Sequence, residues 1–114
     1  MSGISTHVLD TARGRPAAGV EVALARRTAA GGWEELGRGR TDDDGRVGAL
    51  LPEGTPLAPA EYRLTFALGP WFESRGVEAF YPEAAVVFRV RDPAQHHHVP
   101  LLLSPFGYST YRGS

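Results

Sequence analysis

The sequence of 114 residues carries 12 arginines and no lysine against 13 acidic side chains, for a formal net charge of −1. This length predicts one domain, residues 1–114, and the near-neutral charge gives no sign of a nucleic-acid-binding surface. The absence of lysine and cysteine excludes Schiff-base chemistry, P-loop phosphate binding, disulfides, thiol nucleophiles and cysteine metal sites. We expect a cytoplasmic protein with no membrane span, because no apolar stretch approaches the ~20 residues that cross a bilayer.

Residues 4–10 form a β-prone segment whose side chains alternate between two faces. Ser5, His7 and Leu9 share one of these faces, so a histidine lies beside a leucine there. After a turn-rich connection, the segment 20–27 shows the same period of two, which predicts a second strand. The remaining elements predicted in this half are strands over residues 33–41 and 47–51, joined by a tight turn at 42–45.

Residues 61–68 form the clearest core strand, because large apolar side chains occupy every second position. One short helix is predicted at 70–76, with proline near its start and glycine at its end. The closing segment 96–111 has the pattern of a hairpin, and alternation places His98 and Leu102 on one face of its first arm. The other predicted elements are a strand at 86–91, hairpin arms at 96–103 and 108–111, and a turn at 104–107.

A series of short strands with turns about every 8 to 12 residues and one short helix is typical of an antiparallel β-sandwich. We therefore predict an all-β fold of two sheets of about four strands each, packed through alternating Val, Leu and Phe faces. The histidine-bearing faces are an exception to this plain structural pattern. An imidazole, with an ordinary pKa of about 6.5, lies beside apolar side chains on each of them.

His7 and His98 allow a structural and a functional interpretation. A strand histidine is more often a hydrogen-bonded structural residue than a functional one. If both faces are exposed, however, the two histidines would line a wet cleft with apolar walls. Arg46, directly after the acidic turn, is either a solvated charge or a guanidinium that grips an anionic or carbonyl-rich substrate. A metal is the less favoured alternative, because His96 and His98 would need further ligands and only distant His7 could supply one.

Four parts of the sequence together carry a family resemblance. They are residues 5–10 (STHVLD) with 13–17 (RGRPA), residues 41–46 (TDDDGR), residues 80–83 (FYPE), and residues 98–105 (HVPLLLSP) with the ending YRGS at 111–114. Over residues 4–114 the chain resembles the 5-hydroxyisourate hydrolases, the transthyretin-related enzymes of urate breakdown. The YRGS ending separates these hydrolases from the hormone carrier transthyretin, which shares their fold. His7, Arg46 and His98 are also positions where the carrier has other residues.

The resemblance implies a transthyretin-like β-sandwich of two four-stranded sheets with one short helix, assembled as a homotetramer. In this dimer of dimers, the active sites lie in the channel between dimers and use neither a metal nor another cofactor. His7, Arg46 and His98 are the implied catalytic residues, and His97, an aromatic residue in many relatives, is expected to face away from the site. The implied substrate-binding residues are His7, Arg46, Tyr111, Arg112, Gly113 and Ser114, with Leu102 as an apolar wall.

The implied reaction is the hydrolysis of 5-hydroxyisourate to 2-oxo-4-hydroxy-4-carboxy-5-ureidoimidazoline in urate degradation. It needs an activated water, a polarised carbonyl and a proton for the leaving nitrogen. Two histidines can divide the base and acid roles while Arg46 stabilises the oxyanion, but the residues alone do not assign which histidine is the base. The main alternative is a non-catalytic carrier that holds a small aromatic ligand in the same channel.

Overall fold

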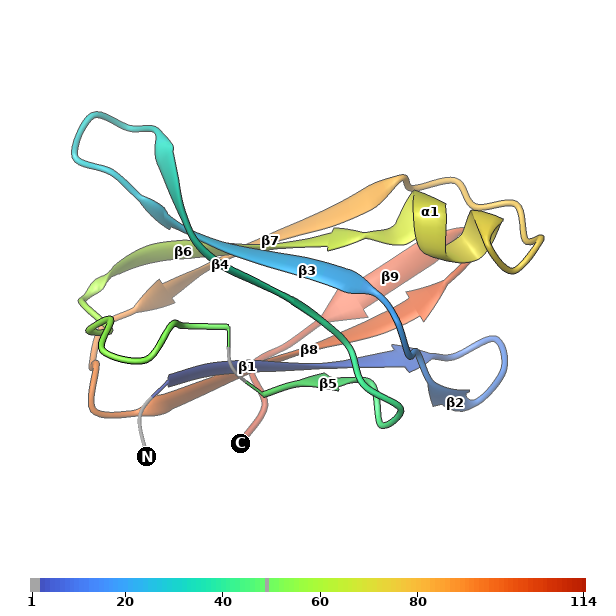
Figure 1. The fold of residues 1–114 in the computed structure, drawn as a ribbon, viewed down its shortest axis with the longest axis horizontal. Coiled ribbons are helices and arrows are strands. Elements are labelled where there is room, and N and C mark those ends of the chain that lie inside the picture. The colour runs from blue at the N-terminus through green and yellow to red at the C-terminus, as the bar shows by residue number, and fades with distance from the viewer. Residues whose placement is uncertain (1–2, 49) are drawn as a thin grey trace.

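The computed structural model describes residues 3–48 and 50–114, which form two facing β-sheets with one short helix at one end (Figure 1). This arrangement confirms the predicted fold class. The first sheet contains β1 (Gly3–Asp10), β2 (Arg15–Pro16), β5 (Arg46–Val47), β8 (His96–Ser104) and β9 (Gly107–Thr110). The second sheet contains β3 (Glu21–Arg27), β4 (Trp33–Arg40), β6 (Ala60–Ala67) and β7 (Glu83–Val90), and α1 (Leu68–Glu73) follows directly on β6.

The first sheet has the order β2-β1-β8-β9, and the two-residue β5 pairs with the same edge of β1 as β2 does. β1 and β8 run parallel, in register from Gly3 opposite His96 to Asp10 opposite Leu103. The other pairs among the described strands are antiparallel, as predicted. Alternation predicts a strand and its two faces but not its direction, so this parallel pair was not foreseen. A parallel pair needs a long crossover, and here the chain between β1 and β8 passes through the whole second sheet.

The core lies between the inner faces of the two sheets and follows the predicted alternation. On β6, the side chains of Tyr62, Leu64 and Phe66 are completely buried. The Tyr62 hydroxyl donates a 2.7 Å hydrogen bond to the carbonyl of Ala58, so its polar end is satisfied. Burial of each large apolar side chain contributes about 1.5–3 kcal/mol. Other buried core residues are Val8, Val20, Val22, Leu24, Leu101 and Leu103.

The helix begins earlier than predicted, at Leu68 instead of Pro70, and it ends at Glu73. Pro70 therefore lies in the first turn, where its missing N–H costs no helical hydrogen bond. The carbonyl of Pro82 accepts the N–H groups of Leu68 and Gly69, which fixes the start of the helix. No helix among the described residues is long and apolar enough to cross a membrane.

The strand predicted over 47–51 is reduced to β5, which covers Arg46 and Val47 only. Ala49 lies outside the described residues. Leu50 leaves the sheet edge and is almost completely buried in the core. The short β5 is nevertheless the element that brings Arg46 to the edge of β1.

Candidate active site

The outward face of β1 and β8 brings together the two histidines predicted to be catalytic. The parallel register sets Ser5 opposite His98 and His7 opposite Pro100. Ser5, His7 and His98 are partly exposed, whereas Thr6 between the first two is buried. The two faces predicted from alternation therefore form one continuous surface on the outside of the first sheet.

The acidic turn at 42–45 places Arg46 beside this surface. The Asp42 Oδ1 atom accepts the backbone N–H of Arg46 over 3.0 Å, which closes the turn. Gly45 has a φ of 77°, and a Cβ there would collide with a backbone oxygen of β1. The chain then pairs with β1 so that Arg46 lies directly opposite His7. The tight turn predicted at 42–45 is thus confirmed, and it leads directly into the pairing of Arg46 with His7.

One hydrogen bond fixes the orientation of His7. Its Nε2 atom lies 2.8 Å from the carbonyl oxygen of Asp44. A carbonyl oxygen only accepts, so Nε2 must carry the proton of this hydrogen bond. In the neutral imidazole the lone pair is then on Nδ1, which leaves that nitrogen to exchange protons with a bound molecule.

His98 is held differently and is kept uncharged. Its Nδ1 atom lies 2.8 Å from the Ser5 hydroxyl, and the same hydroxyl lies 2.7 Å from Nε2 of His96. Partial burial lowers the pKa of His98 below its ordinary value, and the neighbouring His7 and Arg46 lower it further. Near neutral pH, His98 is therefore an unprotonated imidazole that can accept a proton.

These side chains surround an open cleft of about 370 Å³. The cleft combines a permanent cation, Arg46, with a neutral imidazole, His98, and it is open enough to admit a small polar molecule. His7 lies on the same outward face, and Leu102 lies farther along it as a half-buried apolar side chain. The residues that line the cleft are Ser5, Thr6, Arg46, Val47, Gly48, His96, His98 and Ser114.

The end of the chain is tied to this cleft through its backbone. Gly113 forms an isolated antiparallel bridge with His98, in which its N–H donates a 2.8 Å hydrogen bond to the His98 carbonyl. Ser114 follows and lines the cleft. Two of the four predicted tail residues thus lie at or beside the predicted catalytic residues.

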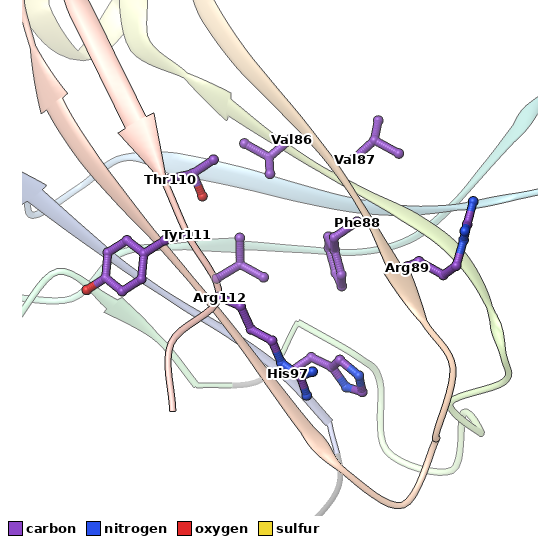
Figure 2. A pocket seen from close by; sticks show the side chains of 9 residues that line it. Val86, Val87, Phe88, Arg89, His97, Thr110, Tyr111 and Arg112 are labelled. Atoms are coloured by element: carbon purple, nitrogen blue, oxygen red, sulfur yellow. The ribbon is translucent and has the colours of Figure 1, made fainter.

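The other two tail residues, Tyr111 and Arg112, line a different cavity of about 200 Å³ (Figure 2). Figure 2 shows the Arg112 side chain extending toward His97, whereas the Tyr111 ring points away from both. Arg112 donates a 3.1 Å hydrogen bond to Gln95, and Tyr111 is 56% exposed. Within the single chain, these two side chains are therefore separated from the cleft. The cavity is lined by Val86, Val87, Phe88, Arg89, His97, Val99, Thr110, Tyr111 and Arg112.

His97 points into the sandwich, away from the cleft, as expected. It is buried, and its Nδ1 atom has no hydrogen-bond partner. Burial lowers the pKa of His97, and the positive charge of Arg112 lowers it further. As for the metal alternative, residues 3–48 and 50–114 contain no group of three or more His, Cys, Asp or Glu side chains placed to hold a metal ion.

Sequence reasoning did not assign Ser5 or His96 to the site. Alternation places Ser5 on the face of His7, and His96 on the face of His98. The Ser5 hydroxyl contacts both His98 and His96, and it can do so because β1 and β8 pair in parallel in this register. The alternation in the sequence therefore indicates which side chains share a face on each strand. It does not indicate that β1 and β8 run parallel, which is what brings the two faces together.

The HIUase/Transthyretin family model matches residues 4–113 of the chain. The chain belongs to this family. A 5-hydroxyisourate hydrolase of Salmonella dublin is 50% identical over 111 residues, which cover 97% of this chain and 80% of that protein.

Two solved structures show that the backbone of this family serves different proteins. The structure of Klebsiella pneumoniae 5-hydroxyisourate hydrolase has a TM-score of 0.86 at 38% identity and covers 100% of both chains. Sea bream transthyretin in complex with thyroxine has a TM-score of 0.90 at 32% identity, covering 96% of this chain and 93% of that one. Because a hydrolase and a thyroxine-binding protein match the fold about equally well, the function must be argued from the side chains in the cleft.

Proposed function

We propose that this protein hydrolyses 5-hydroxyisourate to 2-oxo-4-hydroxy-4-carboxy-5-ureidoimidazoline, a step of urate degradation. The single observation that carries the proposal is the meeting of His7, Arg46 and His98 on one outward face, around the end of the chain. Membership of the family and near-full-length similarity to relatives that carry the hydrolase name make the chain an enzyme of this class.

In the proposed mechanism, His98 is the general base. Its lowered pKa keeps it unprotonated near neutral pH, so it can take a proton from the attacking water. His7 is the proton donor to the leaving nitrogen. Its Nε2–H is held by the Asp44 carbonyl, so in the acid role His7 is the imidazolium: it gives the second proton, on Nδ1, to the leaving nitrogen and returns to the neutral Nε2–H ring. Each of these roles typically accelerates a reaction 10²–10⁴-fold, an order-of-magnitude range for positioned acids and bases.

Arg46 is proposed to bind the substrate and stabilise the oxyanion that forms at the attacked carbonyl. Its guanidinium carries a positive charge and offers several N–H donors in one plane. It lines the cleft together with the base, and no carboxylate among the described residues forms an ion pair with it. The charge is therefore free to interact with a bound carbonyl or anion.

The tail and the assembly complete the proposed site. We place Ser114, with the backbone of Gly113, in contact with substrate, and Leu102 on the apolar wall. Tyr111 and Arg112 contribute by anchoring the tail from the side of the second cavity. Because the face around His98 is only half-buried in one chain, we further propose that a homotetramer, a dimer of dimers, covers it and forms the reaction channel.

The test is the decay of freshly generated 5-hydroxyisourate, followed by ultraviolet absorbance with and without the protein. Hydrolysis faster than the spontaneous reaction supports the proposal, and an unchanged rate refutes it. The similarity to thyroxine-bound transthyretin makes a carrier the specific alternative. A carrier would retain a small aromatic ligand unaltered, and alanine at His7 and His98 would leave that binding unchanged.

A further inference from the structure

The Ser5 hydroxyl joins two imidazoles on the outward face of the first sheet. It comes from β1 and lies 2.8 Å from Nδ1 of His98 and 2.7 Å from Nε2 of His96, both on β8. The proposed mechanism gives a role to His98 but none to Ser5 or His96. All three nevertheless line the cleft, so the chain of hydrogen bonds ends at the proposed base.

The number of protons available limits which atoms can donate in the two hydrogen bonds of Ser5. A serine hydroxyl carries one hydrogen, so it can donate to only one of the two imidazoles. At least one ring nitrogen must therefore bear a proton and donate to Ser5 whenever both contacts are hydrogen bonds. The contact thus couples the protonation of His98 Nδ1 to that of His96 Nε2.

Either the Ser5 hydroxyl donates to Nδ1 of His98, or Nδ1–H of His98 donates to Ser5. The role of His98 as a base decides between these two arrangements. Since Nδ1 of His98 is occupied by Ser5, a water that His98 activates must lose its proton to Nε2. Nε2 has a lone pair in the neutral ring only if the proton is on Nδ1. Nδ1–H then donates to Ser5, and the Ser5 hydroxyl donates to Nε2 of His96. Every donor in the chain has one acceptor, and His98 is left with its lone pair on Nε2, the nitrogen that Ser5 does not contact.

We propose that Ser5 and His96 are positioning residues that hold His98 in the tautomer with an unprotonated Nε2. This inference rests on the proposed function for its catalytic consequence but not for the tautomer itself. Ser5 continues to accept from Nδ1–H after Nε2 has taken a proton, so it also stabilises the imidazolium form of His98. The other groups that face His98, namely His7 on β1, Arg46 on β5 and His96 on its own strand, disfavour that positive charge.

Substitution of Ser5 has two expected consequences. In Ser5→Ala, His98 loses its tautomer preference, and kcat falls about five- to tenfold, the equivalent of one neutral hydrogen bond. Loss of the acceptor also lowers the pKa of His98, so the acidic limb of the kcat/KM profile moves to lower pH. Ser5→Thr retains the hydroxyl and is expected to restore both properties. A purely structural role would alter stability without moving the tautomer or the pH profile.

The experiment is nitrogen NMR of the histidine side chains in the free, histidine-labelled protein above pH 8, with His98 assigned by substitution. We expect wild type and Ser5→Thr to show His98 protonated on Nδ1, and Ser5→Ala and His96→Ala to show a mixture shifted toward Nε2–H. The matched control is Ser74→Ala, which removes a hydroxyl just after α1 and should give the wild-type spectrum.

A His98 protonated on Nε2 in wild type would overturn the inference, as would an unchanged tautomer and kcat in Ser5→Ala. If Ser5→Ala does not fold, the wild-type spectrum and His96→Ala decide the question in the same way. Failure of the proposed function gives a different pattern. In that case wild type shows the Nδ1–H tautomer of His98 but does not accelerate the hydrolysis of 5-hydroxyisourate.

Discussion

Gly113 packs so closely against His98 that a Cβ on the glycine would lie 2.6 Å from the imidazole Cδ2 atom. Real Cβ atoms do not approach so closely, so any side chain at this position must move either the tail or the imidazole. The YRGS ending therefore needs glycine at position 113, because no room remains for a side chain beside the imidazole of His98. Its contribution is to let the tail cross His98 without displacing it.

This relationship predicts the behaviour of Gly113→Ala. We expect kcat to fall by about tenfold or more, because a displacement of about 1 Å at a catalytic group can cost up to 10²-fold. Thermal stability should change little, since the neighbouring tail residues are exposed. Gly32→Ala is the control, because a Cβ there makes only an ordinary 3.6 Å contact with Thr28. Wild-type kinetics in Gly113→Ala would contradict the close packing against His98.

The lowered pKa of His98 predicts the pH dependence of the reaction. A base must be unprotonated to act, and burial with neighbouring positive charge keeps His98 unprotonated below the ordinary histidine pKa of about 6.5. We therefore expect kcat/KM to stay high as the pH falls to about 6.5 and to decline only at lower pH. A pH–rate profile measures this limb directly. An acidic limb centred above 6.5 would argue against His98 as the base.

His97 predicts a pH effect on stability rather than on activity. Its pKa is lowered in the folded protein, mainly by burial, so the unfolded chain binds a proton more readily. The associated stability is fully present above the unfolded pKa of about 6.5 and is lost as pH falls toward the folded value. His97→Phe removes this titration and the unpaired Nδ1 atom. The variant should gain about 1 kcal/mol at low pH.

Denaturant unfolding at pH 8 and pH 5.5 checks this expectation for wild type and His97→Phe. The free energy of unfolding should fall more steeply with acidification in wild type than in the variant. Since His97 faces away from the cleft, the turnover rate should be the same in both. Equal pH dependence of stability in the two proteins would show that the buried imidazole titrates as it does in water.

The strand faces could be predicted from the sequence because burial of apolar side chains imposes a period of two. The buried Tyr62 and Leu64 on β6, and the outward His7 and His98, all follow from that rule. The helix was predicted but placed two residues late, since Pro70 marks a first turn without fixing which of its positions it takes. Alternation is a local property, and it succeeded wherever local packing decides the structure.

The contacts within the candidate site depend on long-range pairing, which no local pattern contains. The parallel register of β1 and β8 brings Ser5 to His98 across 93 residues of sequence. For the same reason, the four consecutive residues of the YRGS ending gave no indication that their side chains lie at two different cavities. Tyr111 and Arg112 turn toward the second cavity, whereas Ser114 lines the cleft.

The proposed tetramer predicts that activity depends on assembly. If a second copy covers the outward face of β1 and β8, dilution through the dissociation range opens the cleft to water and weakens its electrostatics. Specific activity should then fall in parallel with the loss of tetramer. Sedimentation velocity and initial rates, measured at matched concentrations, test this. Specific activity that stays constant while the assembly dissociates would show that each chain carries a complete site.

The most direct test of the central claim is the initial rate of 5-hydroxyisourate decay for wild type, His98→Gln and Arg46→Ala at equal protein concentration. Arg38→Ala, which only breaks an exposed ion pair with Glu35 on β4, is the matched control. We predict that wild type and Arg38→Ala accelerate the decay equally. His98→Gln and Arg46→Ala should each lose about 10²-fold or more of that acceleration. If the two cleft variants retained the wild-type rate, the hydrolysis would have to be assigned to another part of the protein.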